Sequence, residues 1–488
     1  MARLTNLFIT FTCAFVVGAA VSFAAFSQTN TQRNDLPEIG VVASEVVTID
    51  KEQIIGDALM RQLRGQAPLV HDPVLEQYIQ DLGNRLVAHA DNTNFPFTFF
   101  FINNNAINAF AFFGGHIGMH TGLIAKADNE SEVASVLAHE IAHVTQRHIA
   151  RRMQAQQRSS PLALASLIGG VLLALADPSA GMAAIQATQA ASAQFQINYT
   201  RSNEQEADRI GIAMLARAGF DPKGAATFFS KLVEASRLVS KPPQRLLSHP
   251  LSENRVADAR ARLESLPQVN LPPSLAFQLA KARIQARYEF DERYALDYFE
   301  AARGKRSGLF NEAIEYGYAL ALLRNDKPEQ AQNVLAPLLQ SRPDNQFYLD
   351  TATDVAIALE SPTKAIEMLN PHFALTPRNP VLALNLANAH LEAEQYEQAI
   401  SILRDFLLTD KEHQLAHQLL SDAYQGANQR ANMHQSKAEV FALSGGYKRA
   451  VDELQFAYNH TGDDHLVKQR IRARIKQFRS EEEKLKSL

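Results

Sequence analysis

The sequence predicts a mainly α-helical protein, with a small β-sheet in its first half and a helical repeat array in its second half. Apolar residues recur at helical spacing along most of the 488 residues, whereas one Phe-rich stretch has the composition of a strand. The second half repeats its own pattern. Because 46% of the residues are hydrophobic and 20% are charged, the chain can bury sizeable cores.

The N-terminus has the pattern of a secretory signal peptide over residues 1–27. An almost wholly apolar run extends from Leu7 to Phe26, and Ala25-Phe26-Ser27 offers a small-x-small cleavage site. An uncleaved membrane anchor is the alternative. Cleavage would remove Cys13, the single cysteine, and a cysteine-free mature chain suits an oxidising compartment such as the periplasm of a Gram-negative bacterium.

Pattern and composition divide the remainder into an arm, two domains and a tail. Residues 28–45 are polar without a helical period and predict a flexible arm, and the first domain occupies 46–268. A Pro-marked linker leads to the repeat array over 269–480, and a tail follows at 481–488. The chain length alone suggests about three domains. These boundaries reduce that estimate to two, the first domain and the repeat array.

The array has a period of 34 residues, which is the length of a tetratricopeptide repeat (TPR). Ala331, Ala365 and Ala399 keep this spacing, and a leucine follows each of them four positions later. The pattern next returns at Ala450, 51 residues after Ala399, which predicts one extra helix in the stack. Chance coincidences in ordinary helical packing are the alternative. A TPR α-solenoid presents a concave surface that usually binds protein segments.

Two segments leave a membrane contact open. The apolar run at 161–176 is short for a bilayer span, so we predict a helical hairpin over 161–195 that covers the site, touches a partner or lies on a membrane. A buried core hairpin is the alternative. The basic stretch 468–486 predicts a solvated capping helix, with a contact to an acidic partner or membrane as the alternative. A net charge of -4 argues against nucleic acid as a partner.

The segment His139-Glu140-Ile141-Ala142-His143 carries the chemistry. Acidic residues precede it and an apolar stripe continues through it, so a helix is predicted here. Histidines four positions apart share one helix face, so His139 and His143 can bind one zinc ion. Glu140 projects about 100° around the helix, where it can act as general base on a metal-activated water. Two surface histidines on an ordinary helix are the alternative.

A catalytic zinc ion needs a third protein ligand. Glu204 and Asp208 lie four positions apart at the start of another predicted helix and share a face. Glu204 could bind the zinc, and Asp208 could accept the free N–H of a ligand histidine. We expect Glu206 to point elsewhere, into solvent. An exposed acidic helix face is the alternative for this pair.

These motifs resemble the M48 family of zinc metallopeptidases, which pairs an HExxH helix with a downstream ExxAD helix. The matching segments are HEIAHVTQRH at 139–148 and EQEAD at 204–208. Residues 108–123 resemble the NAFA…GG…I…GL stretch of that family, although Phe112-Phe113 stands where Pro-Gly is frequent. The resemblance implies a gluzincin-type fold for the first domain.

It also implies roles for single residues. His139, His143 and Glu204 would bind one zinc ion per chain, Glu140 would be the general base, and Asp208 would support catalysis. Signal peptide, peptidase domain and array together are similar to a periplasmic branch of the family. We therefore expect a periplasmic zinc metalloendopeptidase that degrades misfolded or stalled outer-membrane proteins, assists their assembly as a chaperone, and docks on the assembly machinery through its array.

Two other functions stay open. A chaperone or adaptor of outer-membrane assembly, with a latent or mainly structural zinc site, is the main alternative. An exopeptidase is a weaker one, because nothing in the sequence anchors a substrate terminus.

One histidine beyond the two motifs, His249, is a candidate fourth ligand or gate. Ser248-His249-Pro250 and the following Arg255 resemble an HP…R segment of the periplasmic branch. A Pro-stiffened loop can bring His249 to the open zinc position, where it would hold the enzyme latent. Alternatively it stabilises the oxyanion of the reaction, or it is a surface histidine.

Three further histidines have no clear part in the chemistry. The stretch GGHIGMHTGL at 114–123 could be an edge strand that pairs with an extended substrate, or an ordinary strand of the sheet. We interpret His116 and His120, which lie in it, and His148 as structural histidines.

Overall fold

The structure is a computed structural model of the chain. It describes residues 47–159, 201–237, 245, 249–250, 253–266 and 269–487, which all belong to one compact unit. The predicted signal peptide, the arm and the segment 161–195 lie outside the described residues, so their predictions stay untested. None of the helices in the described part of the chain combines the length and hydropathy needed to span a bilayer.

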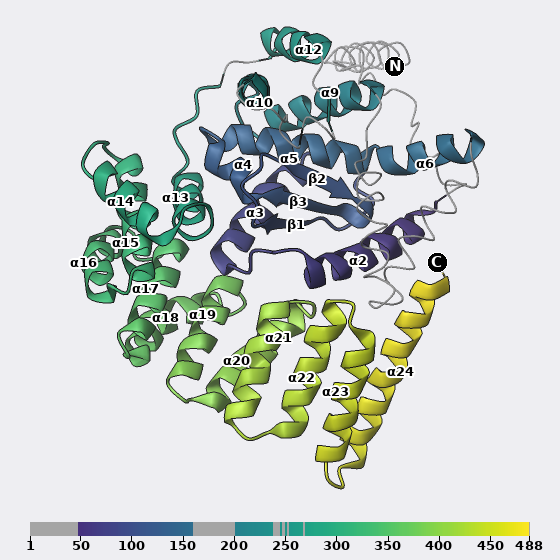
Figure 1. Cartoon of the computed structure of the whole chain (residues 1–488), viewed down its shortest axis with the longest axis vertical. Coiled ribbons are helices and arrows are strands. Elements are labelled where there is room, and N and C mark those ends of the chain that lie inside the picture. The colour runs from purple at the N-terminus through teal and green to yellow at the C-terminus, as the bar shows by residue number, and fades with distance from the viewer. Residues whose placement is uncertain are drawn as a thin grey trace, which may run out of the picture. The chain divides into compact units, whose positions relative to one another are not determined.

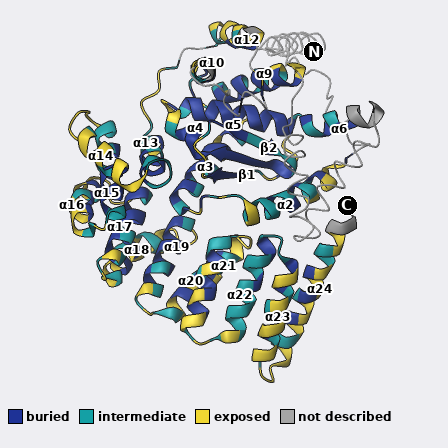
Figure 2. Ribbon diagram, in the orientation of Figure 1, coloured by how far each residue is buried: buried dark blue, intermediate teal, exposed yellow. Residues whose placement is uncertain are grey.

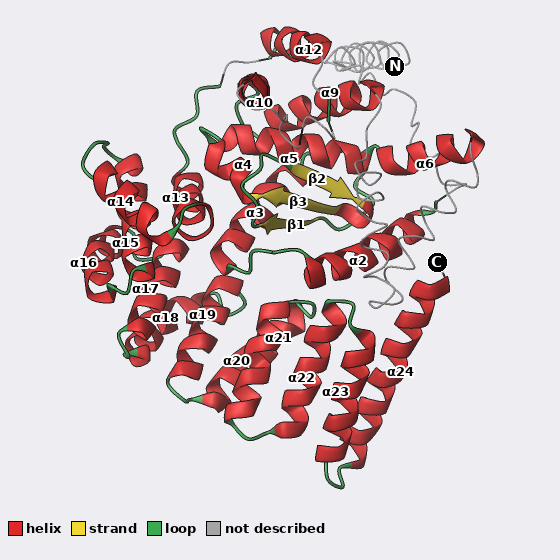
Figure 3. Cartoon of the chain, in the orientation of Figure 1, coloured by secondary structure: helices red, strands yellow, loops and turns green. Residues whose placement is uncertain are grey.

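The first domain packs helices around one small sheet, as Figure 3 shows. This confirms the predicted mainly α-helical class. Its elements are α2 (Ile49–Gln66), α3 (Pro73–Val87), β1 (Thr98–Ile102), β2 (Ala109–Phe112), the 3-10 turn η2 (Phe113–Gly115), β3 (His116–His120), α4 (Thr121–Lys126), α5 (Glu130–Thr145), α6 (His148–Ser159), α9 (Arg201–Arg217), α10 (Lys223–Arg237) and α12 (Glu253–Glu264).

The sheet has the strand order β1-β3-β2. β3 pairs in parallel with β1 and antiparallel with β2, so the expectation of an edge strand within 114–123 is wrong and the ordinary-strand alternative is correct. The cause is the tight turn at η2, where Gly114 and Gly115 have φ of 77° and 81° and fold β3 back onto β2. Positive φ suits glycine, which has no Cβ. Among the described strands, β1 and β2 form the two edges.

Helix α5 lies between the sheet and α9 (Figure 1). Asn129 caps its N-terminus by accepting from the N–H of Glu132 over 3.0 Å. Every residue from Ser131 to Thr145 is buried, which Figure 2 shows as a continuous dark helix. Helix α9 crosses closely at Gly211, where a Cβ would lie 3.1 Å from the backbone N of His139. The motif helix is therefore enclosed rather than exposed.

The second half is the helical array. Its elements are α13 (Leu275–Ile284), the π-helical turn η3 (Gln285–Glu289), α14 (Glu292–Ala302), α15 (Leu309–Arg324), α16 (Pro328–Ser341), α17 (Gln346–Ala358), α18 (Pro362–Leu375), α19 (Pro380–Glu392), α20 (Tyr396–Thr409), α21 (Gln414–Gly426), α22 (Arg430–Leu443), α23 (Tyr447–His460) and α24 (His465–Ser487). The basic stretch 468–486 lies in α24, whose apolar side is buried against α23.

The repeat alanines lie at the centre of the helix pairs. Ala331, Ala365, Ala399 and Ala450 are fully buried, in α16, α18, α20 and α23. The prediction of one extra helix is confirmed, because two helices, α21 and α22, lie between the signature-bearing α20 and α23, whereas one helix lies between α18 and α20. Met433 takes the alanine position in α22, and the sequence signature reappears one helix later, on α23. The array is regular even where its signature is not.

The array packs directly on the first domain. One hydrophobic cluster includes Leu75 and Ile79 of α3 together with Phe277 and Tyr316 of the array. At the other end, Ala58 of α2 belongs to a cluster with residues of α22 and α23. Burial of such surface contributes about 25 cal/mol per Å². The two halves of the chain therefore share a core rather than being joined only by a linker.

Candidate metal centre

The three predicted ligands meet between α5 and α9. His139 and His143, one turn apart on α5, have their Nε2 atoms 2.9 Å from each other. The Glu204 carboxylate on α9 lies 3.5 Å from each Nε2. All three side chains are buried. The structure thus brings together the residues that the two sequence motifs selected.

His249 joins the same group. Its Nδ1 lies 3.4 Å from His139 Nε2 and 3.1 Å from Glu204 Oε1. One potential ligand atom from each of the four residues lies within 4.8 Å of the other three. Three imidazoles and a carboxylate are a donor set that suits a divalent transition-metal ion. The residues present therefore fit a metal site with His249 at its fourth position.

Local electrostatics favour the metal-binding forms of His143 and Glu204. Burial lowers the pKa of His143 well below its usual value, which favours the neutral imidazole. Burial would raise the pKa of Glu204, but His249 and His139 outweigh it and hold the pKa below the ordinary value. Metal ligands must be deprotonated, so both shifts favour the binding form.

Asp208 lies behind His139. Its Oδ1 is 2.9 Å from His139 Nδ1, on the side of the ring away from Nε2. Arg255 donates to both oxygens of Asp208, over 2.7 and 2.8 Å, and its Nη1 lies 2.7 Å from Glu204 Oε2. Although burial raises the pKa of Asp208, the hydrogen bonds with Arg255 and His139 outweigh it and keep the carboxylate ionised. Asp208 occupies the place that the sequence predicted for it.

Glu140 is fully buried beside the four-residue group. Its Oε1 accepts from Nη1 of Arg245 over 2.7 Å, and His249 Nε2 lies 3.6 Å from the same oxygen. The backbone N–H of His249 donates to the carbonyl of Arg245 over 2.7 Å, so the two residues belong to one turn of the chain. The sequence analysis missed Arg245, because no motif surrounds it.

His148 and Glu206 were also missed. His148 Nδ1 lies 2.7 Å from His143 Nδ1, and its Nε2 lies 3.1 Å from Glu206 Oε2. The expectation that Glu206 points into solvent is wrong, because Arg151 of α6 also donates to this carboxylate over 2.9 Å. The hydrogen bond with His148 contributes most to lowering the pKa of Glu206 to about 2. The sequence carried no clear signal for this pair, because a spacing of five residues does not place His148 on the helix face of His143.

The remaining histidines lie outside the group. His116 Nε2 is 3.1 Å from Asp57 Oδ1, and His120 is buried with its ring edge-on to Phe110. Neither belongs to the four residues whose ligand atoms converge.

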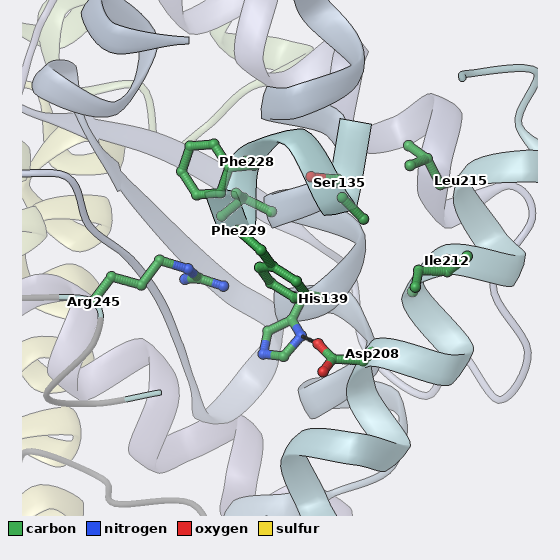
Figure 4. Close-up of a pocket in the computed structure, with 11 residues that line it drawn as sticks. Ser135, His139, Asp208, Ile212, Leu215, Phe228, Phe229 and Arg245 are labelled. Carbon is green, nitrogen blue, oxygen red and sulfur yellow. Dashed lines mark ion pairs between the residues drawn. The ribbon is translucent and has the colours of Figure 1, made fainter. Parts of the chain in front are cut away.

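A small pocket adjoins the centre (Figure 4). Side chains of α5, α9 and α10 line it, among them Val136, Ile212 and Phe229. Figure 4 shows Asp208 against His139, with Arg245 reaching in from the opposite side. The walls of this space are mostly apolar.

Comparison with known proteins shows which protein families the chain is similar to. A family model described as Peptidase family M48 matches residues 73–263, and one described as Tetratricopeptide repeat matches 356–423. A Vibrio cholerae protein named "Putative beta-barrel assembly-enhancing protease" is 45% identical over 455 residues, which cover 93% of this chain and 94% of the relative. The "Beta-barrel assembly-enhancing protease" of Escherichia coli K12 is 42% identical over 482 residues, with 99% and 98% covered.

Proposed function

Because the chain belongs to the family of beta-barrel assembly-enhancing proteases and combines an M48 metallopeptidase domain with tetratricopeptide repeats, we propose that it is a zinc endopeptidase of outer-membrane protein quality control. Its substrates would be misfolded or stalled outer-membrane proteins, and it would also assist their assembly as a chaperone. The observation that carries the peptidase part is the buried convergence of His139, His143 and Glu204 beside Glu140.

The metal would be one zinc ion per chain, held by His139, His143 and Glu204. When bound, zinc activates water and polarises the carbonyl of the scissile peptide. Two imidazoles and one carboxylate with a further position for water are a frequent ligand set of catalytic zinc sites. Asp208 fixes His139 with its Nε2 towards the site.

Glu140 would be the general base. Its Oε2 has no hydrogen-bond partner among the described residues, whereas Oε1 is held by Arg245. Oε2 is therefore the atom available to take a proton from the attacking water. The same carboxyl group then donates that proton to the leaving amine.

His249 would keep the enzyme latent. Its imidazole lies within the ligand group. There it would occupy the fourth position, which a substrate carbonyl or water would need. Arg245, one turn earlier, engages Glu140 at the same time. Cleavage then requires both side chains to leave. A role of His249 in stabilising the oxyanion is the alternative.

The partners and the location follow from the same premise. The relatives' names refer to beta-barrel assembly, and tetratricopeptide repeats usually bind protein segments, so the array would hold clients or dock on the assembly machinery. Residues 1–27 would direct export to the periplasm, and 161–195 would provide any peripheral membrane contact.

A second function, a chaperone or adaptor with a latent or mainly structural metal, is favoured by the contacts of His249 and Arg245 with the site. Glu140→Gln separates the two functions. We expect this variant to bind one zinc ion, measured by elemental analysis, and to leave a misassembled outer-membrane protein uncleaved. Glu329→Gln, on the exposed face of α16, is the matched control.

The peptidase proposal fails if Glu140→Gln still cleaves. If the variant does not cleave but restores every phenotype of a strain lacking the protein, the chaperone function is the important one.

A further inference from the structure

We propose that His148, Glu206 and Arg151 form a directional hydrogen-bond chain that sets the tautomer and orientation of the ligand His143. This inference rests on the proposed function, because it concerns how the same metal site is built. The three residues act through His143 rather than on the metal or the substrate, so they are positioning residues.

The direction of the chain follows from the donors and acceptors. His143 turns its Nε2 towards His139 and Glu204, so this atom must offer its lone pair to the metal. The proton of the neutral ring then lies on Nδ1, which is 2.7 Å from His148 Nδ1. His148 Nδ1 must accept, since two N–H groups cannot share this contact.

The remaining links are fixed in turn. With Nδ1 as acceptor, His148 carries its proton on Nε2, which lies 3.1 Å from Glu206 Oε2. An ionised carboxylate only accepts, and Arg151 Nη1 donates to the same oxygen over 2.9 Å. The N–H groups therefore point from His143 to His148 and from His148 to Glu206. Each hydrogen bond has its donor and acceptor fixed by the one before it.

The hydrogen-bond chain matters for His143 because its two imidazoles are buried. The side chains of His143 and His148 have no exposed surface, whereas that of Glu206 is 25% exposed. An N–H that loses its partner at a buried site is destabilising. Loss of His148 would remove the acceptor that lies 2.7 Å from Nδ1 of His143 and loosen the hold on its ring.

The other ligand histidine is held in a comparable way. His139 faces Asp208, which Arg255 holds, just as His143 leads through His148 to Glu206, which Arg151 holds. Behind each ligand histidine there is thus a carboxylate that is paired with an arginine. On the His143 side, the imidazole of His148 lies between His143 and the carboxylate of Glu206 and links the two.

The backbone supports this arrangement. Arg147, between α5 and α6, has a φ of 50° and turns the chain so that His148 begins α6 next to α5. The buried guanidinium of Arg147 donates to Glu52 and to the carbonyl of Val47. A residue with positive φ that is not glycine needs such support.

The test uses the full exported chain carrying Glu140→Gln, which avoids self-cleavage. His148→Phe keeps a ring without nitrogen, and Glu206→Ala removes the carboxylate. Competition with a chromophoric chelator measures the zinc Kd. We expect both variants to raise it about 10- to 100-fold, the usual effect of losing a partner behind a metal ligand. The controls are His89→Phe and Glu234→Ala, two exposed positions, and should leave Kd unchanged.

Two further measurements keep the outcome unambiguous. His148→Gln has an amide that can accept and donate, and it should recover part of the zinc affinity. Histidine ¹⁵N NMR of the parent chain should show His143 protonated on Nδ1 and His148 protonated on Nε2. If His148→Phe does not fold, Glu206→Ala and the NMR measurement decide alone.

The proposal is overturned if Glu206→Ala binds zinc within about twofold of the parent chain, or if His148 carries its proton on Nδ1. Failure of the proposed function gives a different result, namely a parent chain without zinc. That result overturns both proposals, because the tautomer of His143 follows from metal binding at Nε2, whereas either result above in a zinc-binding parent chain overturns this proposal alone.

Discussion

Arg245 donates from Nη1 to Oε1 of Glu140 over 2.7 Å, and both side chains are buried. The same Nη1 lies 3.2 Å from the carbonyl oxygen of Ala109 in β2, and the backbone N–H of Arg245 donates to the carbonyl of Ile107. One residue therefore engages the proposed general base and the edge strand together. An extended substrate that adds to the sheet needs such backbone groups.

Arg245→Met should increase peptidase turnover. The substitution keeps the aliphatic bulk but frees Glu140 and the carbonyl of Ala109. Initial rates on an unfolded protein substrate with zinc in excess measure the effect, at a temperature where the variant is folded. Arg342→Met, at an exposed ion pair with Glu312, is the control. A rate below that of the unsubstituted chain would instead assign Arg245 to substrate binding.

His249→Ala should change cleavage without removing the metal. His139, His143 and Glu204 still provide three ligands, so we expect one zinc ion per chain by elemental analysis. Cleavage should rise, because the fourth position becomes free. A fall would favour the oxyanion role, and an unchanged rate with full zinc content would remove His249 from the mechanism.

Arg283→Met should strongly destabilise the protein. Arg283 of α13 is buried and pairs with Asp72 over 2.7 Å and with Asp350 over 2.6 Å. Without it, Asp350 loses its ion pair and Asp72 keeps only the more distant Arg287, at 3.8 Å. Removing one partner of a buried ion pair costs about 3–5 kcal/mol. Urea denaturation measures the loss. Arg342→Met, at an exposed ion pair, should leave the free energy of unfolding nearly unchanged, and a similarly small loss in Arg283→Met would contradict the prediction.

His120 should make stability depend on pH. Burial lowers the pKa of His120, and a hydrogen bond with the backbone of Ala106 offsets only part of this. The unfolded chain, with an ordinary histidine pKa of about 6.5, then binds more protons than the native state. Stability from this residue is therefore complete above about pH 6.5 and falls below it, by at most about 1.4 kcal/mol per pH unit.

His120→Gln removes this titration. In metal-free protein, urea denaturation between about pH 5 and pH 7.5 should give a flatter dependence for the variant than for the unsubstituted chain. His89→Gln, at an exposed position, should keep the original slope. Equal slopes for His120→Gln and the unsubstituted chain would show that this histidine does not titrate as its burial requires.

The ligand group could be predicted from the sequence because its geometry is mostly local. His139 and His143 share a helix face through their spacing alone, and so do Glu204 and Asp208. Arg245 and the pair of His148 and Glu206 could not be found in this way, because each acts on a residue of another element. Their roles depend on how the elements pack.

The arrangement of the larger elements shows the same limit. The 34-residue period predicted the array, since each repeat packs only against its neighbours. Strand order is not local in this sense. The central place of β3 depends on β1 pairing with it across the intervening residues 103–115, and on the two glycines that fold it onto β2. A pattern of alternating residues is the same for a central and an edge strand.

Asp72 contacts one residue that is synthesised soon after it and one that is synthesised much later. Its Oδ1 accepts from the N–H of Leu75 and starts α3, while its Oδ2 accepts from Arg283, more than 200 residues later in the chain. A nascent chain that emerges from its N-terminus has the cap long before it has the counter-ion. Helix α3 therefore reaches its final, buried environment only after α13 has been made, and the peptidase half completes its core only once the array has begun to form.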